Sequence, residues 1–409
     1  AAARGRRRHG PAARTAAAHT GAARLAAAML PAAVLTLFAG PMVPLPAPDI
    51  VELLDSVSVS HSDEGRSTFQ VVLRAMREFP TGLLDYPVLI SQRVKVGTRI
   101  VLVLTVNAIP QVLMDGIVTH QQLNPGDKPG SGSITITGED LGVLLDQVEL
   151  RMPFPGNDTA LAYTLLAPYA AVGLTPMVIP PPTDTPPDPT RTLPHPQGTA
   201  WAILQQKAEQ HGYAFCILPG PLPGQSLAYF GPRIPAVLPQ RALTLKMGAA
   251  DNVTNISFQH DGTASTQVIG LVQDDNPAAT LPPLPVFGLP MLTPPLAVMP
   301  SLYVNQPIVK TRYLEPTAGT NWARAQLLAS AETTASTVKA VTASGEVDTA
   351  RYGSVLQARQ LVGVRGVGYS FDGLYYVKSV SHSIRRGEYK QSFQLSREGL
   401  GSSVPAVIP

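Results

Sequence analysis

At 409 residues the chain is long enough for two to four compact units with substantial buried cores. The chain has 31 basic and 28 acidic residues, a net charge of +3. Six of the basic residues are arginines in residues 1–48, which contain no acidic residue, so the rest of the chain carries 25 basic and 28 acidic residues. Such a balance excludes nucleic-acid binding by phosphate neutralisation. The single cysteine, Cys216, excludes an internal disulfide and a cysteine-only metal site, and its alternating apolar surroundings predict a buried structural thiol.

Residues 1–48 combine an arginine-rich start with an uncharged, alanine-rich apolar stretch. The stretch contains Pro31 and is shorter than the roughly twenty apolar residues that a transmembrane helix needs. We predict a non-globular arm that docks on a partner protein, with a membrane-directed segment or a secretory signal peptide as alternatives. The docking side chains would be the apolar ones, namely Leu25, Met29, Leu30, Val34, Leu35, Leu37 and Phe38.

Residues 49–140 carry short β-branched and apolar segments separated by Gly, Pro and Asp. This spacing predicts five or six short strands and a first small β-barrel. The predicted strands lie around Val57, Phe69–Leu73, Val88–Ile90, Ile100–Val106, Gly116–His120 and Ser133–Thr137.

Residues 141–241 change in character and predict a module of helices with a hairpin. Short helices are expected at Glu139–Leu145 and at Asp158–Leu166, the second capped by Asn157, and a longer one at Ala200–Gln210, capped by Thr199. A hairpin should follow, formed by Tyr213–Leu218 and Leu227–Phe230. The run 176–196 holds nine prolines and predicts an extended surface loop.

Residues 242–400 return to strand patterns and predict a second barrel. Strands are expected at Leu243–Met247, Val253–Phe258 and Gln267–Val272, with a proline-rich insertion at 277–307. A helix at 321–332 should turn Trp322, Ala325, Leu328 and Ala329 inward, and residues 401–409 form a tail.

One repeated sequence pattern suggests that the two predicted barrels are related. Val96–Arg99 (VGTR) precedes Met114–Val118 (MDGIV) and His120, while Val362–Arg365 (VGVR) precedes Phe371–Leu374 (FDGL) and His382. The predicted fold is therefore mainly β, with two small related β-barrels flanking a helical and hairpin module.

The most informative segment is a second predicted hairpin near the C-terminus. Leu374–Ile384 and Tyr389–Ser396 have strong strand preference and flank a turn at residues 385–387, where Gly387 tolerates a positive φ. The step Asp372-Gly373 is a turn signal before the first strand.

The sequence of this hairpin resembles that of the baseplate hub proteins of contractile tails, the phage late control protein D family. It also resembles the hub half of the valine–glycine repeat spike proteins (VgrG-like) of type VI secretion. The likeness is specific near the C-terminus, loose from Asp49 onward and absent from residues 1–48. The matching residues, here called the C-terminal signature, are Gly366, Val367, Gly368, Phe371, Asp372, Gly373, Tyr375, Tyr376, Val377, Ser381, His382, Ser396, Arg397 and Gly399.

The resemblance implies a non-enzymatic baseplate hub of a phage tail or contractile injection system. Three copies with two similar barrels each would adapt a sixfold inner tube to a threefold spike, and the spike would be a separate protein. The implied partners are further copies in a homotrimer, the tube protein, the spike protein and other baseplate proteins. The chain would be made in the cytoplasm and assembled into a particle. The alternative is an exported, membrane-tethered β-rich binding protein.

Patterns typical of catalysis are absent from the sequence. It contains no His-Glu-x-x-His, no Gly-x-Ser-x-Gly and no Walker loop, and the glycine-rich run 363–368 leads into a strand rather than a helix. Three short polar runs, His61–Glu64, His260-Asp261 and Asp274–Asn276, read as turns, and His382 as a satisfied strand histidine. Glu139 with Asp140 could be imagined as a glycosidase pair, a cell-wall hydrolase being a distant alternative. We therefore expect no catalytic, cofactor or metal residues.

Overall fold

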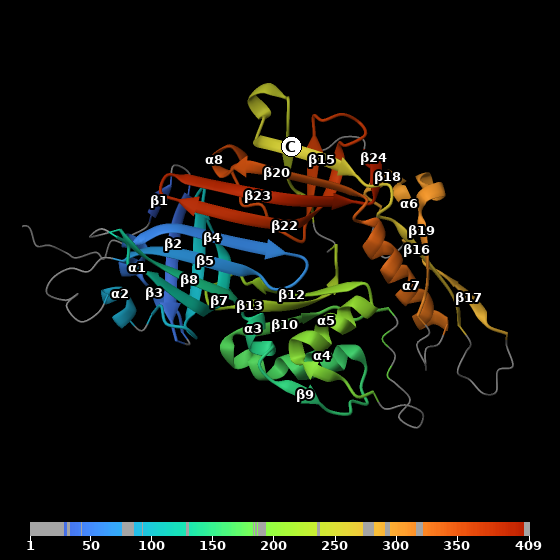
Figure 1. Cartoon of the computed structure of the whole chain (residues 1–409), viewed down its shortest axis with the longest axis horizontal. Helices are drawn as coiled ribbons and strands as arrows, with labels where there is room; N and C mark the ends of the chain where they lie inside the picture. Colours follow the sequence, from blue (N-terminus) through green and yellow to red (C-terminus); the bar gives the residue numbers. More distant parts are fainter. Residues whose placement is uncertain are drawn as a thin grey trace, which may run out of the picture.

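The structure is a computed structural model that describes residues 28–404, apart from 31–32, 42, 76–85, 92, 128–130, 183, 185, 187–193, 235–237, 273–281, 291–294 and 316–321. A 14-stranded sheet dominates the molecule (Figure 1), which confirms the prediction of a mainly β fold. A helical module lies below this sheet, and an extension built around one long helix lies at the end of the molecule far from the first strands.

The first half of the large sheet, here called the N-terminal group, consists of six antiparallel strands in the spatial order β2-β6-β7-β8-β5-β4. Its inward side chains form one apolar core that includes Leu35, Phe69 and Ile136. The bounds are β2 (Ala33–Gly40), β4 (Leu54–Ser62), β5 (Thr68–Ala75), β6 (Arg99–Val106), β7 (Ile109–Asn124) and β8 (Gly132–Asp140). The short segments β1 (Ala28–Leu30), β3 (Leu45–Pro46), α1 (Pro48–Glu52) and α2 (Pro87–Ile90) lie beside them.

The prediction of a non-globular arm is wrong for the described part of residues 1–48. Strand β2 pairs with β6 along its whole length, from Ala33 to Gly40. Its side chains alternate between the two faces of the sheet. Leu35 and Leu37 are fully buried in the apolar core of the N-terminal group, whereas Val34 and Phe38, on the other face, are partly buried. Met29 and Leu30 belong to β1, which pairs with β2, and Leu25 lies outside the described residues.

The second half of the sheet, the C-terminal group, has six strands in the order β14-β21-β22-β23-β20-β15. Both groups have the same spatial order of strands. If the six strands of each group are numbered from one to six along the chain, they lie side by side in the order 1-4-5-6-3-2. The groups differ in that β14 runs parallel to β21, whereas β2 runs antiparallel to β6. The bounds are β14 (Gln240–Thr244), β15 (Val253–His260), β20 (Val341–Asp348), β21 (Leu361–Arg365), β22 (Gly373–Arg385) and β23 (Glu388–Arg397).

A bulge at the same place in both groups fixes how they align. In the β7–β8 hairpin the register shifts just after Val118, and in the β22–β23 hairpin it shifts just after Val377. With these two valines aligned, Asp115 corresponds to Leu374 rather than to Asp372. The repeat read from the sequence is therefore out of register, although the two groups do share a strand order.

The two groups join through one strand pairing, here called the seam. Strand β4 pairs antiparallel with the second half of β22, from Ser62 opposite Ser379 to Ser56 opposite Arg385. The tip of the β22–β23 hairpin thereby reaches the N-terminal core, where Ile384 is buried. The expected turn at this tip is present, with Gly387 at φ +81°.

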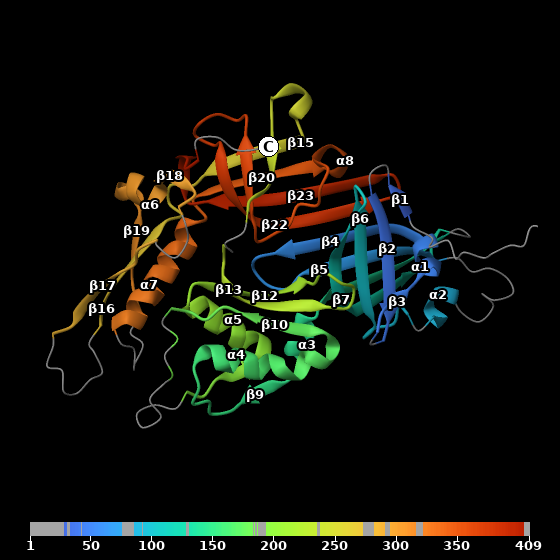
Figure 2. The ribbon, with the colours of Figure 1, turned by 180° about the vertical axis from the view of Figure 1, so that it is seen from behind.

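The helical module packs its hairpin between its helices and the N-terminal group (Figure 2). The predicted caps are confirmed, because the side chains of Asn157 and Thr199 accept hydrogen bonds from the first turns of α4 and α5. The bounds are α3 (Gly142–Leu145), β9 (Glu149–Arg151), α4 (Asp158–Leu166), η2 (Ala167–Val172), β10 (Leu174–Val178), β11 (Gln197–Thr199), α5 (Ala200–Gln210), β12 (Tyr213–Pro219) and β13 (Ser226–Pro232).

Two sequence expectations fail in this module. The helix predicted from Glu139 begins later, because Glu139 and Asp140 still belong to β8. The proline-rich run at 176–196 is not a loop throughout, since β10 pairs in parallel with β13 and contains Pro176. This proline is tolerated because β10 is an edge strand.

The proline-rich insertion 277–307 is likewise partly ordered into strands. Strands β17 and β19 flank β16, and α7 covers one face of this small sheet through Ala325 and Ala329, which are fully buried. Trp322, expected inward, is 42% exposed and donates its indole N–H to the Pro285 carbonyl. The bounds are η3 (Gly248–Ala250), β16 (Thr266–Val272), β17 (Leu284–Phe287), β18 (Ala297–Pro300), α6 (Ser301–Val304), η4 (Gln306–Ile308), β19 (Lys310–Tyr313), α7 (Trp322–Thr337), α8 (Thr349–Tyr352) and β24 (Gly399–Ser402).

Candidate assembly site

The C-terminal signature gathers around a fully buried arginine. Arg397 donates to the carbonyl oxygens of Gly399, Asp372 and Ser370, each at 2.9 Å. Its guanidinium also lies 4.4 Å from the ring centroid of Tyr375. Burial lowers the pKa of Arg397. One side chain thus links β23, β24 and the loop before β22, which makes Arg397 the centre of a rigid corner.

The glycine-rich loop before β22 is closed by Asp372. Its Oδ1 accepts the backbone N–H groups of Val367 and Gly368 at 2.8 and 3.2 Å. Gly366 has φ +92°, and a Cβ there would lie 1.9 Å from the Leu245 carbonyl oxygen. The loop is therefore a tight structural turn that leads into a strand, and it lacks the helix N-terminus that a nucleotide phosphate needs.

The remaining signature residues lie along the β22–β23 hairpin. Tyr375 donates its hydroxyl to the Phe371 carbonyl at 2.7 Å, and Gly399 packs against the backbone of Met299. Tyr376, Val377 and Ser396 are buried within the hairpin. Gly373, with φ +129°, starts β22 beside Arg397. The structure therefore separates the signature into a corner at one end of β22 and a smaller set, Ser381 and His382, at the seam.

Two buried histidines meet at the seam. His382 contacts the Tyr389 hydroxyl at 2.9 Å through Nδ1, and its ring centroid lies 5.7 Å from that of His61 in an edge-to-face arrangement. Burial lowers the pKa of His61 to about 4 and that of His382 well below its usual value, so both rings are neutral at pH 7. The expectation that His61 sits in a turn is wrong, because it lies in β4.

Metal ligation finds no support at these histidines. Within the described ranges, no three His, Cys, Asp or Glu side chains are grouped so that they could hold a metal ion. Cys216 is buried, as predicted, and burial raises the pKa of its thiol. It lines a cavity of about 580 Å³ between the two sheet groups and the β12–β13 hairpin, together with His61, Arg359 and His382.

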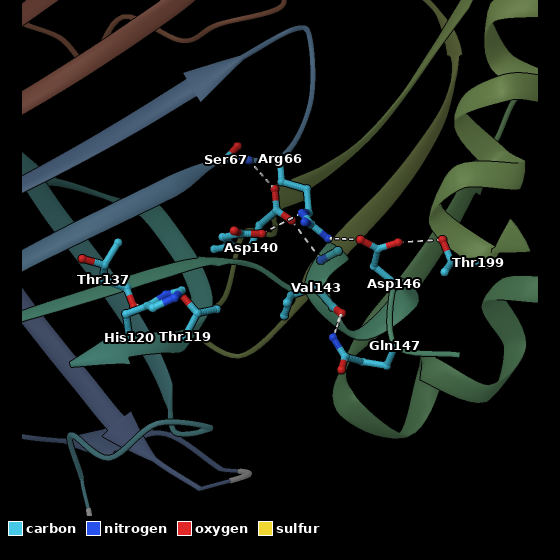
Figure 3. A network of polar contacts seen from close by, with 12 residues as sticks. Arg66, Ser67, Thr119, His120, Thr137, Asp140, Val143, Asp146, Gln147 and Thr199 are labelled. Atoms are coloured by element: carbon cyan, nitrogen blue, oxygen red, sulfur yellow. Dashed lines mark hydrogen bonds and ion pairs between the residues drawn. The ribbon is translucent and has the colours of Figure 1, made fainter. Parts of the chain in front are cut away.

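A polar clamp ties the N-terminal group to the helical module (Figure 3). Asp140 accepts the backbone N–H of Ser67 at 2.6 Å and that of Gly142 at 2.9 Å, and burial raises its pKa to about 6 although both hydrogen bonds oppose the shift. Arg66 pairs with Glu139 at 2.7 Å and with Asp146 at 2.9 Å. Each carboxylate of the imagined glycosidase pair thus has a structural partner.

A second clamp uses a buried ion pair. Arg99 donates to both carboxylate oxygens of Asp115 at 2.7 and 2.6 Å. It also donates to the carbonyl oxygens of Val172 and Gly224, and Ser226 donates to Asp115 at 3.0 Å. The repeated sequence pattern drew attention to both charged residues, but nothing in the sequence indicated that they bind each other or the helical module.

In the described ranges, no helix is long and apolar enough to cross a bilayer. Leu35 and Leu37 of β2 belong to the apolar core of the N-terminal group, so they are not available as a docking surface.

Comparison with known proteins finds matches in structure alone. No family profile and no characterised protein matches the sequence. A tail protein from Neisseria meningitidis MC58 shares 15% identity at a TM-score of 0.58, covering 90% of this chain and 98% of that one. The 43 kDa tail protein of prophage MuSo2 from Shewanella oneidensis shares 12% identity with the same TM-score and coverage.

The fold resembles that of phage tail proteins. It also resembles a chain of the half-lidded Francisella PdpA–VgrG complex, with 8% identity, a TM-score of 0.55, and coverage of 93% of this chain and 60% of that one. The C-terminal signature predicted a likeness to tail hub and VgrG-like proteins, and the fold confirms this likeness.

Proposed function

We propose that this chain is a structural hub subunit of a phage tail or a contractile injection system. The observation that carries the proposal is the repeated strand order of the two sheet groups, which gives one chain two similar modules. The resemblance to phage tail proteins along nine-tenths of the chain supports it.

The repeated module suggests how such a subunit would work. Rotationally symmetric rings place the same surface at every position, so a sixfold tube cannot dock evenly on a threefold spike. Three copies of a chain with two similar modules present six similar surfaces to the tube. The helical module and the α7 extension occur once in each chain, so the opposite surface keeps threefold symmetry.

The clamps would supply the stiffness that such a mechanical role requires. Arg99–Asp115 and the Asp140 network hold the helical module against the N-terminal group, and the Arg397 corner fixes the hairpin that forms the seam. Removing one partner of a buried charged network costs several kcal/mol, so these joints resist separation under load. The proposed role is to transmit thrust rather than to catalyse a reaction.

The proposed partners are further copies of this chain, the inner tube protein, a spike protein and other baseplate proteins, within an assembled particle. The exported, membrane-tethered alternative loses its main support, because β2 is a core strand.

Cell fractionation tests the proposal. The chain should sediment with hollow tail-like particles and remain there after washing with detergent. Recovery only from membranes, as a detergent-extracted monomer, would contradict it.

A further inference from the structure

The C-terminal group ends in an open strand edge at a position that is covered in the N-terminal group. Strand β15 pairs with β20 on one side, and along its other side the described part of the chain places no strand. Strand β4, which holds the same place in the N-terminal group, is covered by β22. The two positions can be compared residue by residue.

The alignment follows from the strand registers. Val57 lies opposite Val71, which lies opposite Ile136 in β8. Ile256 lies opposite Gly345, which lies opposite Phe393 in β23. Ile136 and Phe393 are equivalent once the bulges are aligned. The equivalent residues of β4 and β15 are therefore Val57 and Ile256, Val59 and Phe258, Ser60 and Gln259, and His61 and His260.

Burial differs sharply between these equivalent residues. Val57 and Val59 are each 1% exposed and His61 is 8% exposed. Ile256 and Phe258 are only partly buried, and His260 is exposed. The side chains on β15 keep the alternating apolar pattern of a covered strand but lack the cover.

The surface that would provide this cover is present on β7. Residues 379–383 of β22 pair with residues 58–62 of β4, and they are equivalent to residues 120–124 of β7. Within the described residues, 120–124 pair with β8 and with no other strand. Leu123 is 38% exposed there, and the Nε2 of Gln121 is buried without a hydrogen-bond partner. This half of β7 is thus a second open edge of the same kind.

Neither edge carries the features that keep exposed strands from pairing. Such edges normally carry lysine, proline or inward charges, and neither 253–260 nor 119–124 contains a lysine, arginine, proline or acidic residue. Both strands therefore suit pairing with another strand.

We propose that β15 of one copy pairs antiparallel with residues 119–124 of β7 in the next copy, in the register of the β4–β22 seam. This inference rests on the proposed function and gives its ring a specific joint. Transferring the seam register places Gln259 opposite Gln122, Phe258 opposite Leu123 and His260 opposite Gln121. Each chain then has one internal and one intermolecular seam, and three chains close a ring with six similar seams.

Engineered cysteines test the register in the full-length chain. Directly opposed residues of an antiparallel pair lie within disulfide range. The variant Gln259→Cys/Gln122→Cys should form covalent dimers and trimers under mild oxidation, seen on non-reducing gels. Its internal counterpart, Ser60→Cys/Ser381→Cys, replaces hydroxyls that lie 3.0 Å apart in the existing seam and should cross-link within one chain. The pair Gln259→Cys/Gln121→Cys is one residue out of register and should cross-link poorly.

The native mass of the unmodified chain separates failure of the seam from failure of the ring. Trimers that cross-link through 259 and 122 support the inference. Trimers in which this pair stays reduced while the internal control oxidises would overturn the seam and leave the ring intact. A monomer that does not cross-link would overturn both. As a second measurement, Gln259→Lys/Gln122→Lys should lose the trimer by repulsion, and Gln259→Glu/Gln122→Lys should regain it. Trimers in both charge variants would also overturn the seam.

Discussion

The N-terminal and C-terminal groups share a strand order but differ in how completely they are covered. In the N-terminal group, strand β4 pairs with β22 of the C-terminal group, and its apolar side chains are fully buried. In the C-terminal group, no described strand pairs with the outer side of the equivalent strand β15, and its apolar side chains remain partly exposed. The comparison teaches that two groups with the same strand order, joined once within a chain, leave one strand edge uncovered among the described residues.

The groups also place opposite charges at one equivalent position. Asp140 ends β8 and accepts two backbone N–H groups, whereas Arg397 ends β23 and donates to three backbone carbonyls. Each side chain thus ties its hairpin to a different neighbour, the helical module in one group and the β24 corner in the other. The two groups therefore share a strand order but differ in the buried charge at this position.

The largest expected effect comes from removing Arg397, the buried charge of the C-terminal group. Arg397→Met leaves three buried carbonyl oxygens without donors, so we expect the free energy of unfolding to fall by about 4 kcal/mol. Chemical denaturation followed by circular dichroism measures it. Arg151→Met, on the exposed face of β9, is the matched control and should change stability by less than about 0.5 kcal/mol. Equal effects would show that the Arg397 corner is not a structural centre.

The second prediction concerns the turn after β21, where the two groups differ although their bulges align. Strand β21 ends at Arg365 while β6 continues, and Gly366 makes the turn. Gly366→Ala combines a positive φ with a close approach to Leu245, so it should cost about 3 kcal/mol. Gly387→Ala, at φ +81° with open space around its Cβ, should cost about 1 kcal/mol. Thermal melting of both variants measures the difference, and the reverse order would contradict this account of the loop.

The third prediction uses the pH dependence of Asp140. Its pKa is raised to about 6 in the folded chain, so the contribution of this carboxyl to stability is fully present below the unfolded pKa near 4 and is lost as pH rises through 6. The stability of the native chain relative to Asp140→Asn should fall by about 2 kcal/mol between pH 4.5 and 7.5. Urea titrations at the two pH values test this, and a constant difference would exclude the raised pKa.

The smallest effect is expected at the open edge of the N-terminal group. Leu123→Ser removes an exposed side chain, so it should change the free energy of unfolding of the isolated subunit by less than about 0.5 kcal/mol. Val59→Ser, at the covered edge, should cost about 2 kcal/mol or more because it places a hydroxyl in the N-terminal core. Similar losses in the two variants would remove the contrast between covered and open edges.

The parts of the fold that could be predicted are those with local signals. The caps Asn157 and Thr199, the hairpin turn at Gly387 and the strand patterns of β22 and β23 depend on neighbouring residues. Strand β2 was missed because its alanines and leucines in an uncharged run also describe an export signal. Strands β10 and β17 were missed because proline usually marks a loop, although it is tolerated at the edge of a sheet.

The candidate site was predictable only in part for the same reason. The sequence marked the C-terminal signature, and the structure gathers much of it around Arg397. The two clamps and the seam join residues that are far apart in the chain, such as Arg99 with Gly224 and Ser60 with Ser381. No local pattern reports such contacts, because the topology decides which distant strands meet.

Under the proposed function, paired modules let three chains present sixfold-like symmetry. Averaged electron-microscopy images of the purified oligomer, combined with its native mass, test this claim most directly. We expect a ring of three times 43.2 kDa with six similar densities on one face and three on the other. A stable single molecule, or a ring whose subunit number is not three, would contradict the account.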